Sequence, residues 1–221
     1  MKKLQVCSCL FFLALLWVST SYVQAEKTGK VDKNVYTDLK FGFKITALGN
    51  WKVKSEKDPS LVRVIMTQKN YKVSGIPGAS QYTTAIPAII ILSDTTSLSL
   101  KQFEESLLKE GKLLQNKEEF MIKLDLLLNS EYIEDNDVMI DSIPARDYTL
   151  KQPYKKTGQD IRVKDPVAGG SVILQDFLAG HVILFKKDKN IYVVQFSCER
   201  EFFYPTNSEF QKIIGSWKFI Q

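Results

Sequence analysis

Residues 182–197 read Val-Ile-Leu-Phe-Lys-Lys-Asp-Lys-Asn-Ile-Tyr-Val-Val-Gln-Phe-Ser. Two apolar runs, rich in β-branched and aromatic residues, flank the polar segment Lys187–Asn190, which is typical of two strands joined by a tight turn. Strands joined by so short a connection run antiparallel, because parallel strands need a long crossover. This stretch therefore predicts an antiparallel sheet.

Alternating or continuous apolar runs predict strands along much of the remaining chain. The predicted strands cover residues 35–37, 41–46, 51–55, 61–67, 88–92, 132–134, 138–140, 146–150 and 172–178. Gly180-His181 is interpreted as the turn between the last of these strands and the one at 182–186. Residues 69–85, with two glycines and a proline, predict an exposed loop, and residues 118–129 are assigned to a further strand.

Two helices are predicted from capping boxes, in which a Ser or Thr and a Glu or Gln three residues later satisfy backbone N–H groups. One box pairs Ser99 with Gln102, and the other pairs Thr206 with Glu209. Apolar residues follow at helical spacing: Leu100, Phe103, Leu107 and Leu114 in the first helix, and Phe210, Ile213 and Ile214 in the second, before Gly215. We expect an α+β fold, a mostly antiparallel β-sheet flanked by helices, in a single domain over residues 34–221.

Residues 1–25 have the pattern of a secretory signal peptide. Lys2 and Lys3 precede an apolar run from Val6 to Val18, and Val-Gln-Ala25 supplies a cleavage site. The alternative, a retained membrane anchor, is disfavoured because this run is shorter than the roughly 20 apolar residues of a spanning helix. We expect cleavage after Ala25, a polar leader over residues 26–33, and export to the periplasm or the extracellular space.

Charge and cysteine content both change on this expected cleavage. Two lysines and no acidic residue are removed, so the net charge falls from +5 to +3. The remaining lysines alternate with acids along the chain, so we expect no nucleic-acid partner. Cys198 is left as the one cysteine, which excludes an internal disulfide. A buried structural thiol is favoured over a reactive or intermolecularly paired one.

The sequence gives little support for a catalytic site. His181 is the chain's one histidine, it is expected in a turn, and no G-x-S-x-G motif accompanies it. A zinc site would need further His or Cys ligands. We therefore predict no catalytic residue, no cofactor and no enzyme activity, with convergent carboxylates as the one route left open to a hydrolase.

Acidic residues cluster at 131–141. The favoured interpretation is a solvated hairpin tip, because the glycine and the terminal glutamate of a calcium loop are missing. The alternative is a site for a hard cation such as Ca²⁺ on Glu134, Asp135 and Asp137. Asp141 belongs to the same cluster.

Three consecutive aromatic residues, Phe202, Phe203 and Tyr204, precede the last predicted helix. They indicate either packing that anchors this helix or a docking patch for a protein partner. Both interpretations stay open at this point.

Four segments, in the same order, resemble PsbP/Mog1-like domains. They are Phe43-Lys-Ile-Thr-Ala-Leu-Gly-Asn-Trp51, Ile143-Pro-Ala-Arg-Asp-Tyr148, Ile191-Tyr-Val-Val-Gln-Phe-Ser197 and Ile214-Gly-Ser-Trp-Lys-Phe219. Leu48 and Ser142 depart from the usual proline and glycine of the family. The resemblance implies an α/β/α sandwich and a non-catalytic role, since relatives are accessory subunits of a photosynthetic complex, a binder of a small GTPase and bacterial envelope proteins.

These observations together favour an exported, non-enzymatic accessory or binding protein that docks on an envelope or secreted protein assembly. The alternative is a carrier of a small apolar or amphipathic ligand, held between sheet and helix. The basis for this alternative is the abundance of large apolar residues at positions 100–128.

Overall fold

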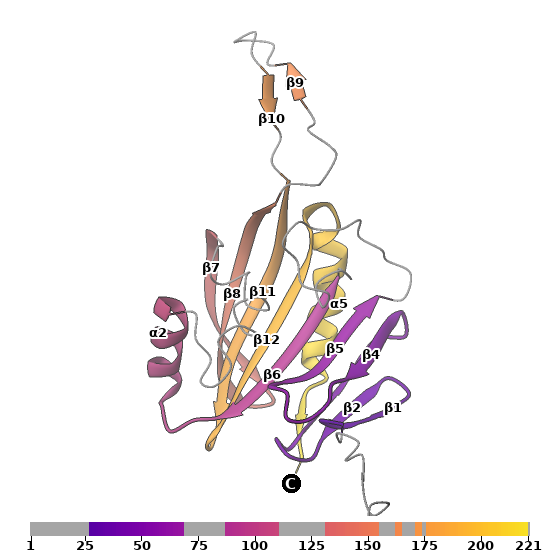
Figure 1. The fold of residues 1–221 in the computed structure, drawn as a ribbon, viewed down its shortest axis with the longest axis vertical. Helices are drawn as coiled ribbons and strands as arrows, with labels where there is room; N and C mark the ends of the chain where they lie inside the picture. Colours follow the sequence, from indigo (N-terminus) through magenta and orange to yellow (C-terminus); the bar gives the residue numbers. More distant parts are fainter. Residues whose placement is uncertain are drawn as a thin grey trace, which may run out of the picture.

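The computed structural model describes residues 27–68, 87–110, 131–154, 162–164, 171–173 and 176–220. Antiparallel strands make up most of them, together with the α-helices α2 (Leu100–Glu110) and α5 (Phe203–Gly215) and the short 3₁₀ helix η2 (Arg200–Phe202) (Figure 1). The expected α+β class with a mostly antiparallel sheet is confirmed. No helix among these residues is long and apolar enough to cross a membrane.

Seven strands form the main sheet, with every neighbouring pair antiparallel. Their order is β4 (Trp51–Ser55), β5 (Val62–Gln68), β6 (Ala88–Thr95), β12 (Asn190–Glu199), β11 (Asp176–Lys187), β8 (Ile143–Tyr154) and β7 (Glu131–Ile140). The predicted hairpin is the pair β11 and β12, whose last cross-strand partners are Lys187 and Asn190. It lies inside the sheet, where both of its edges are paired.

A second, four-stranded sheet departs from the single sheet that the sequence predicts. Its order is β1 (Lys30–Asp32), β2 (Val35–Asp38), β3 (Phe43–Thr46) and β13 (Lys218–Phe219). Strand β1 lies in the segment expected to be a polar leader, and its exposed side chains give no apolar signal. A separate hairpin joins β9 (Arg162–Lys164) to β10 (Ser171–Ile173).

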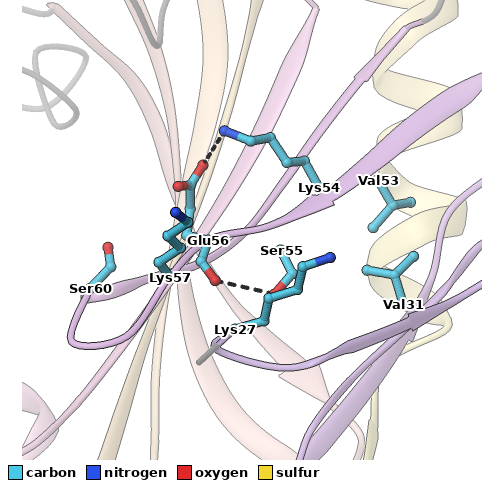
Figure 2. A pocket seen from close by; sticks show the side chains of 8 residues that line it. All are labelled: Lys27, Val31, Val53, Lys54, Ser55, Glu56, Lys57 and Ser60. Carbon is cyan, nitrogen blue, oxygen red and sulfur yellow. Dashed lines mark hydrogen bonds and ion pairs between the residues drawn. The ribbon is translucent and has the colours of Figure 1, made fainter. Parts of the chain in front are cut away.

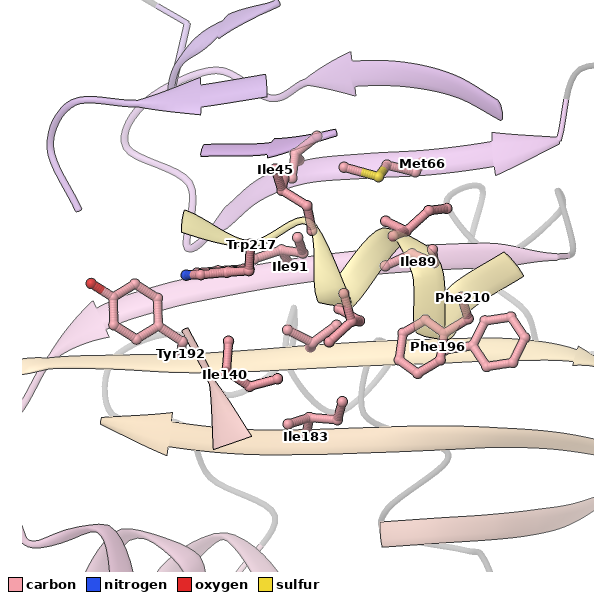
Figure 3. Close-up of a cluster of buried hydrophobic side chains, with 14 of the residues drawn as sticks. Ile45, Met66, Ile89, Ile91, Ile140, Ile183, Tyr192, Phe196, Phe210 and Trp217 are labelled. Carbon is pink, nitrogen blue, oxygen red and sulfur yellow. The ribbon is translucent and has the colours of Figure 1, made fainter. Parts of the chain in front are cut away.

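Two apolar clusters fill the core. In one, Phe210 and Ile213 of α5 pack with Phe196 of β12 and with side chains of the second sheet, including Ile45 (Figure 3). In the other, Phe103 and Leu107 of α2 pack with the remaining buried face of the main sheet. Alternate residues of β12 belong to alternate clusters, which explains why the central strands read as continuous apolar runs. Strand β5 is also buried on both faces over its first five residues.

Gly180 and His181 do not form a turn, contrary to the prediction. Both lie inside β11, where Gly180 is paired with Ser197 of β12 and with Leu150 of β8. A Cβ atom on Gly180 would lie 2.0 Å from the carbonyl oxygen of Phe196. The glycine therefore permits a close approach of two backbones, which is its other common role in strands.

The two predicted helix starts have different outcomes. The capping box before α2 is confirmed, since Ser99 N donates to Gln102 Oε1 at 2.9 Å and Gln102 N donates to Ser99 Oγ at 3.2 Å. The second helix begins at Phe203, about one turn before the predicted box, and its N-cap has no side-chain hydrogen bond. Pro205 fits there because the first turn of a helix leaves its N–H groups without intrahelical partners.

Residues 131–140 form one strand, where two short ones were predicted. Strand β7 pairs with β8 throughout, with an irregularity between Tyr132 and Glu134. Acidic and amide residues occupy its middle, so the apolar alternation is interrupted while the backbone pairing continues. The predicted loop at 69–85, the strand at 118–129 and Leu114 lie outside the described residues.

Replacing Gly180 by alanine should destabilise the protein by about 1–3 kcal/mol, because the added methyl group would collide with backbone atoms of β12. The matched control is Gly215→Ala, since an added Cβ there meets no atom within 4 Å. Urea denaturation of the two variants measures both effects. Equal stability of the two variants would contradict the close approach described for Gly180.

Candidate functional site

His181 is buried in the core, so its predicted turn position was wrong. Its Nδ1 lies 2.9 Å from Asp147 Oδ1 on the neighbouring strand β8, and both residues are less than 10% exposed. A carboxylate only accepts hydrogen bonds, so Nδ1 carries the proton in this contact. The Nε2 atom is buried and has no hydrogen-bond partner among the described residues.

Aromatic rings enclose this imidazole. The ring of Phe203 stacks on His181 at a centroid distance of 5.8 Å and an interplanar angle of 14°, and Phe210 stacks at 5.4 Å and 23°. Phe196 stacks on Phe210 at 4.6 Å. The first turn of α5 is therefore attached to the main sheet by a stack of rings centred on His181.

The three consecutive aromatic residues at 202–204 have different surroundings. Phe203 is half-buried and points into the ring stack, as the packing interpretation predicts. Tyr204 is 85% exposed and Phe202 is 39% exposed. Arg200 and Pro205 beside them are also exposed. We call Arg200, Phe202, Tyr204 and Pro205 the α5 aromatic surface.

Glu134, Asp135 and Asp137 of β7 are exposed, and two of them contact one arginine. Arg146 of β8 donates from Nη1 to Asp137 Oδ1 at 2.7 Å and from Nη2 to Asp135 Oδ2, and its Nε lies 3.5 Å from Glu104 of α2. The hydrogen bond to Asp137 raises the pKa of Arg146 above its ordinary value. Glu134 is exposed. Within the described ranges, no three His, Cys, Asp or Glu side chains are placed to hold a metal ion.

Asp141 belongs to a different contact, at the end of the second sheet. Its carboxylate accepts from Lys218 Nζ and from the backbone N–H of Phe219, both at 2.8 Å. The hydrogen bond from Lys218 lowers the pKa of Asp141 below its ordinary value. Asp141 thus fixes the position of β13.

The predicted buried position of Cys198 is confirmed. Burial raises the pKa of its thiol to about 12, and the negative charge of Glu199 acts in the same direction. The thiol is therefore protonated at neutral pH, which is the unreactive form.

A buried ion pair between the two sheets is the feature that sequence patterns missed. Arg63 Nε of β5 donates to Asp38 Oδ2 of β2 at 2.7 Å, and both side chains are at most 1% exposed. Tyr36 donates to the same oxygen at 2.9 Å, and the backbone N–H of Phe41 donates to Asp38 Oδ1 at 3.0 Å. Both oxygens of the carboxylate therefore accept hydrogen bonds.

The remaining donors of Arg63 hold the start of the described chain. Nη2 donates to the carbonyl oxygen of Thr28 at 2.8 Å, and Nη1 donates to Asp58 Oδ1 at 2.9 Å and to the Ser60 carbonyl at 3.0 Å. Burial lowers the pKa of Arg63, but the hydrogen bond and charge of Asp38 outweigh burial and raise it. Removing one partner of such a pair costs about 3–5 kcal/mol, because the other charge stays buried.

The structure describes only some of the apolar residues on which the ligand-carrier alternative rests. Phe103 and Leu107 are buried against the main sheet, and Leu100 packs at the edge of the same cluster. Positions 111–128 lie outside the described residues.

Neither a protein-family model nor a curated protein matches the sequence. Among the solved structures similar to the chain is PsbP of Synechocystis sp. PCC 6803, with 14% sequence identity over 86% of this chain and 95% of that one and a TM-score of 0.43. LpqN of Mycobacterium tuberculosis, which is involved in cell envelope biogenesis, has 10% identity over 81% of this chain and 83% of that one and a TM-score of 0.44. A mutant of the protein Mog1 has 12% identity over 89% of this chain and 96% of that one and a TM-score of 0.37. The chain spans 45% of the length of a further similar structure, from Bacteroides thetaiotaomicron. PsbP and Mog1 are also the proteins whose domains the sequence motifs resemble. At such identities the likeness concerns the fold alone.

The free energy of unfolding should fall as the pH rises from about 9 to about 12. In this window an unfolded Cys198 loses its proton while the buried native thiol keeps it, so alkali favours the unfolded chain. The slope from one such group approaches roughly 1.4 kcal/mol per pH unit. Urea denaturation of Cys198→Ala at several pH values should show a shallower slope than the parent protein. An unchanged slope would contradict the burial of this thiol.

Proposed function

We propose that the protein is an exported, non-enzymatic binding protein that docks on an envelope or secreted protein assembly through the α5 aromatic surface. The observation that carries this proposal is Tyr204, whose side chain is 85% exposed at the first turn of α5. Residues 1–25 support export through their signal-peptide pattern.

The chemistry of this surface suits a protein partner. Tyrosine and arginine are the residue types that dominate binding energy at protein interfaces, and Phe202, Tyr204 and Arg200 lie within five positions of one another. Exposed aromatic rings lose contact with water when a partner covers them, which favours association. Aromatic side chains also have few rotatable bonds, so fixing them costs little entropy.

The stack beneath the surface supports the same proposal. Phe203 lies between the two exposed rings in sequence and is held by His181 and Phe196. The backbone that presents Phe202 and Tyr204 is thereby fixed before any partner binds, and a preorganised surface binds at a lower entropic cost.

The arrangement of the layers belongs to this proposal as well. We infer an α/β/α sandwich in which α2 and α5 cover opposite faces of the main sheet. Its support is the separation of Phe103 and Phe210, one from each helix, into the two core clusters. The α5 aromatic surface then lies at one end of one outer layer.

Replacing Tyr204 by alanine should abolish recovery of the partner without destabilising the fold. Surface substitutions of this kind change stability by about 0.5 kcal/mol or less. The matched control is Leu39→Ala, because Leu39 is 82% exposed in the connection between β2 and β3. Affinity purification of tagged wild-type and variant proteins from the native envelope, under gentle extraction, measures recovery.

A stoichiometric partner that is recovered with the wild type and with Leu39→Ala, and is lost with Tyr204→Ala, is the expected result. Recovery of the mature protein alone in every sample would count against docking. Equal recovery with Tyr204→Ala would agree with a binding protein but would show that the α5 aromatic surface is not its docking site.

A further inference from the structure

A pocket of about 550 Å³ opens between the two sheets (Figure 2). Its lining residues lie between positions 27 and 60, and none of them belongs to α5. Strand β1 is at the edge of the four-stranded sheet and β4 is at the edge of the main sheet, and Val31 and Val53 come from these two strands. The β4–β5 connection adds Glu56 and Lys57, and Lys27 precedes β1. Ligand pockets in proteins commonly have volumes of roughly 300–1,000 Å³.

Positive charge dominates the lining of this pocket. Three lysines, Lys27, Lys54 and Lys57, face one carboxylate, that of Glu56. Lys54 Nζ forms an ion pair with Glu56 Oε1 at 2.9 Å, so this carboxylate neutralises Lys54. Neither Lys27 nor Lys57 has a carboxylate within ion-pair distance among the residues that the structure describes.

These two lysines are also cross-strand neighbours. Lys27 and Lys57 are partners in an isolated antiparallel bridge. Like charges directly opposite each other destabilise a strand pair. The ammonium groups of Lys27 and Lys57 point in different directions around the pocket (Figure 2). An anion in the pocket would offset this concentration of positive charge, which favours anion binding.

Backbone hydrogen bonds hold the lysines in place. Thr28 N donates to the Glu56 carbonyl at 2.8 Å, next to the bridge. Ser55 Oγ accepts from Gly29 N at 3.2 Å and donates to the Gly29 carbonyl at 2.9 Å. Arg63 donates to the Thr28 carbonyl. The backbone that carries Lys27 and Lys57 is therefore held by the fold before a ligand binds.

We propose that this pocket binds an anionic head group, a phosphate or a carboxylate, that carries a short apolar chain. Lysine ammonium groups bind such anions as point charges, without the planar geometry that arginine requires. Val31 and Val53 supply the apolar contact for the chain. This site is independent of the proposed docking through α5, so either can fail without the other.

Isothermal titration calorimetry with octyl phosphate and with inorganic phosphate tests the proposal. Octyl phosphate should bind more tightly than inorganic phosphate, because the valines contact only the alkyl chain. Binding should weaken as salt rises, since mobile ions screen the partly exposed charges. The double variant Lys27→Gln/Lys57→Gln should lower the affinity for octyl phosphate about tenfold or more, because charged hydrogen bonds are lost.

The control variant is Lys101→Gln/Lys212→Gln, which removes the same charge from exposed positions on α2 and α5. It should bind octyl phosphate as the wild type does. Equal losses in both double variants would show a general charge effect and would overturn the site. The same holds if octyl phosphate does not bind or if Lys27→Gln/Lys57→Gln binds it unchanged.

Vesicles distinguish a free ligand from a membrane source of the same head group. Sedimentation with phosphatidylglycerol vesicles and with phosphatidylcholine vesicles is measured for the wild type and both double variants. Binding of octyl phosphate in solution, with no sedimentation, assigns a free ligand. Sedimentation with phosphatidylglycerol alone, lost in Lys27→Gln/Lys57→Gln, assigns the anionic head group to a membrane surface. Sedimentation that both double variants retain contradicts the proposal.

Discussion

The buried ion pair between Arg63 and Asp38 joins the two sheets of this protein. Each charge alone would be costly in the core, where water does not solvate it. The cost is offset because Asp38 also accepts from Tyr36 and from the Phe41 backbone, and because Arg63 also donates to Asp58 and to backbone carbonyls. Burial raises the pKa of Tyr36, so its hydroxyl remains a donor to Asp38 at alkaline pH.

The basic pocket is a consequence of this pair. Arg63 holds the carbonyl of Thr28, and Thr28 Oγ1 donates back to the carbonyl of Arg63 at 2.5 Å. These two contacts fix the segment that carries Lys27 and so bring it beside Lys57. The α5 aromatic surface has a separate foundation, the ring stack around His181. The ion pair thus organises the segment of the pocket, and the ring stack organises the start of α5.

Local patterns predicted the parts of the fold that local interactions determine. The hairpin at 182–197 and the helix cap at Ser99 depend on neighbouring residues, and both are present. The sequence placed Gly180 in a turn, which is a common position for glycine. The structural reason for this glycine is the nearby carbonyl of Phe196, which belongs to a different strand and leaves no local sequence signal. Strand β1 has no apolar residue that the core buries, so no alternation marked it.

The candidate sites were predictable to different degrees. The aromatic run at 202–204 was visible in the sequence, but which ring faces outward is decided by where α5 begins. Arg63 and Asp38 are 25 positions apart, so nothing local indicates their pairing. Lys27 and Lys57 are likewise brought together only by the meeting of two sheets.

Hydrogen exchange of individual amides in Asp38→Asn, compared with the wild type, tests the central role of the ion pair most directly. If this pair holds the pocket segment, the amides of Thr28 and Gly29 lose protection in the variant, while those of the central strands β11 and β12 keep it. Unchanged protection of Thr28 and Gly29 in a folded Asp38→Asn protein would contradict the account.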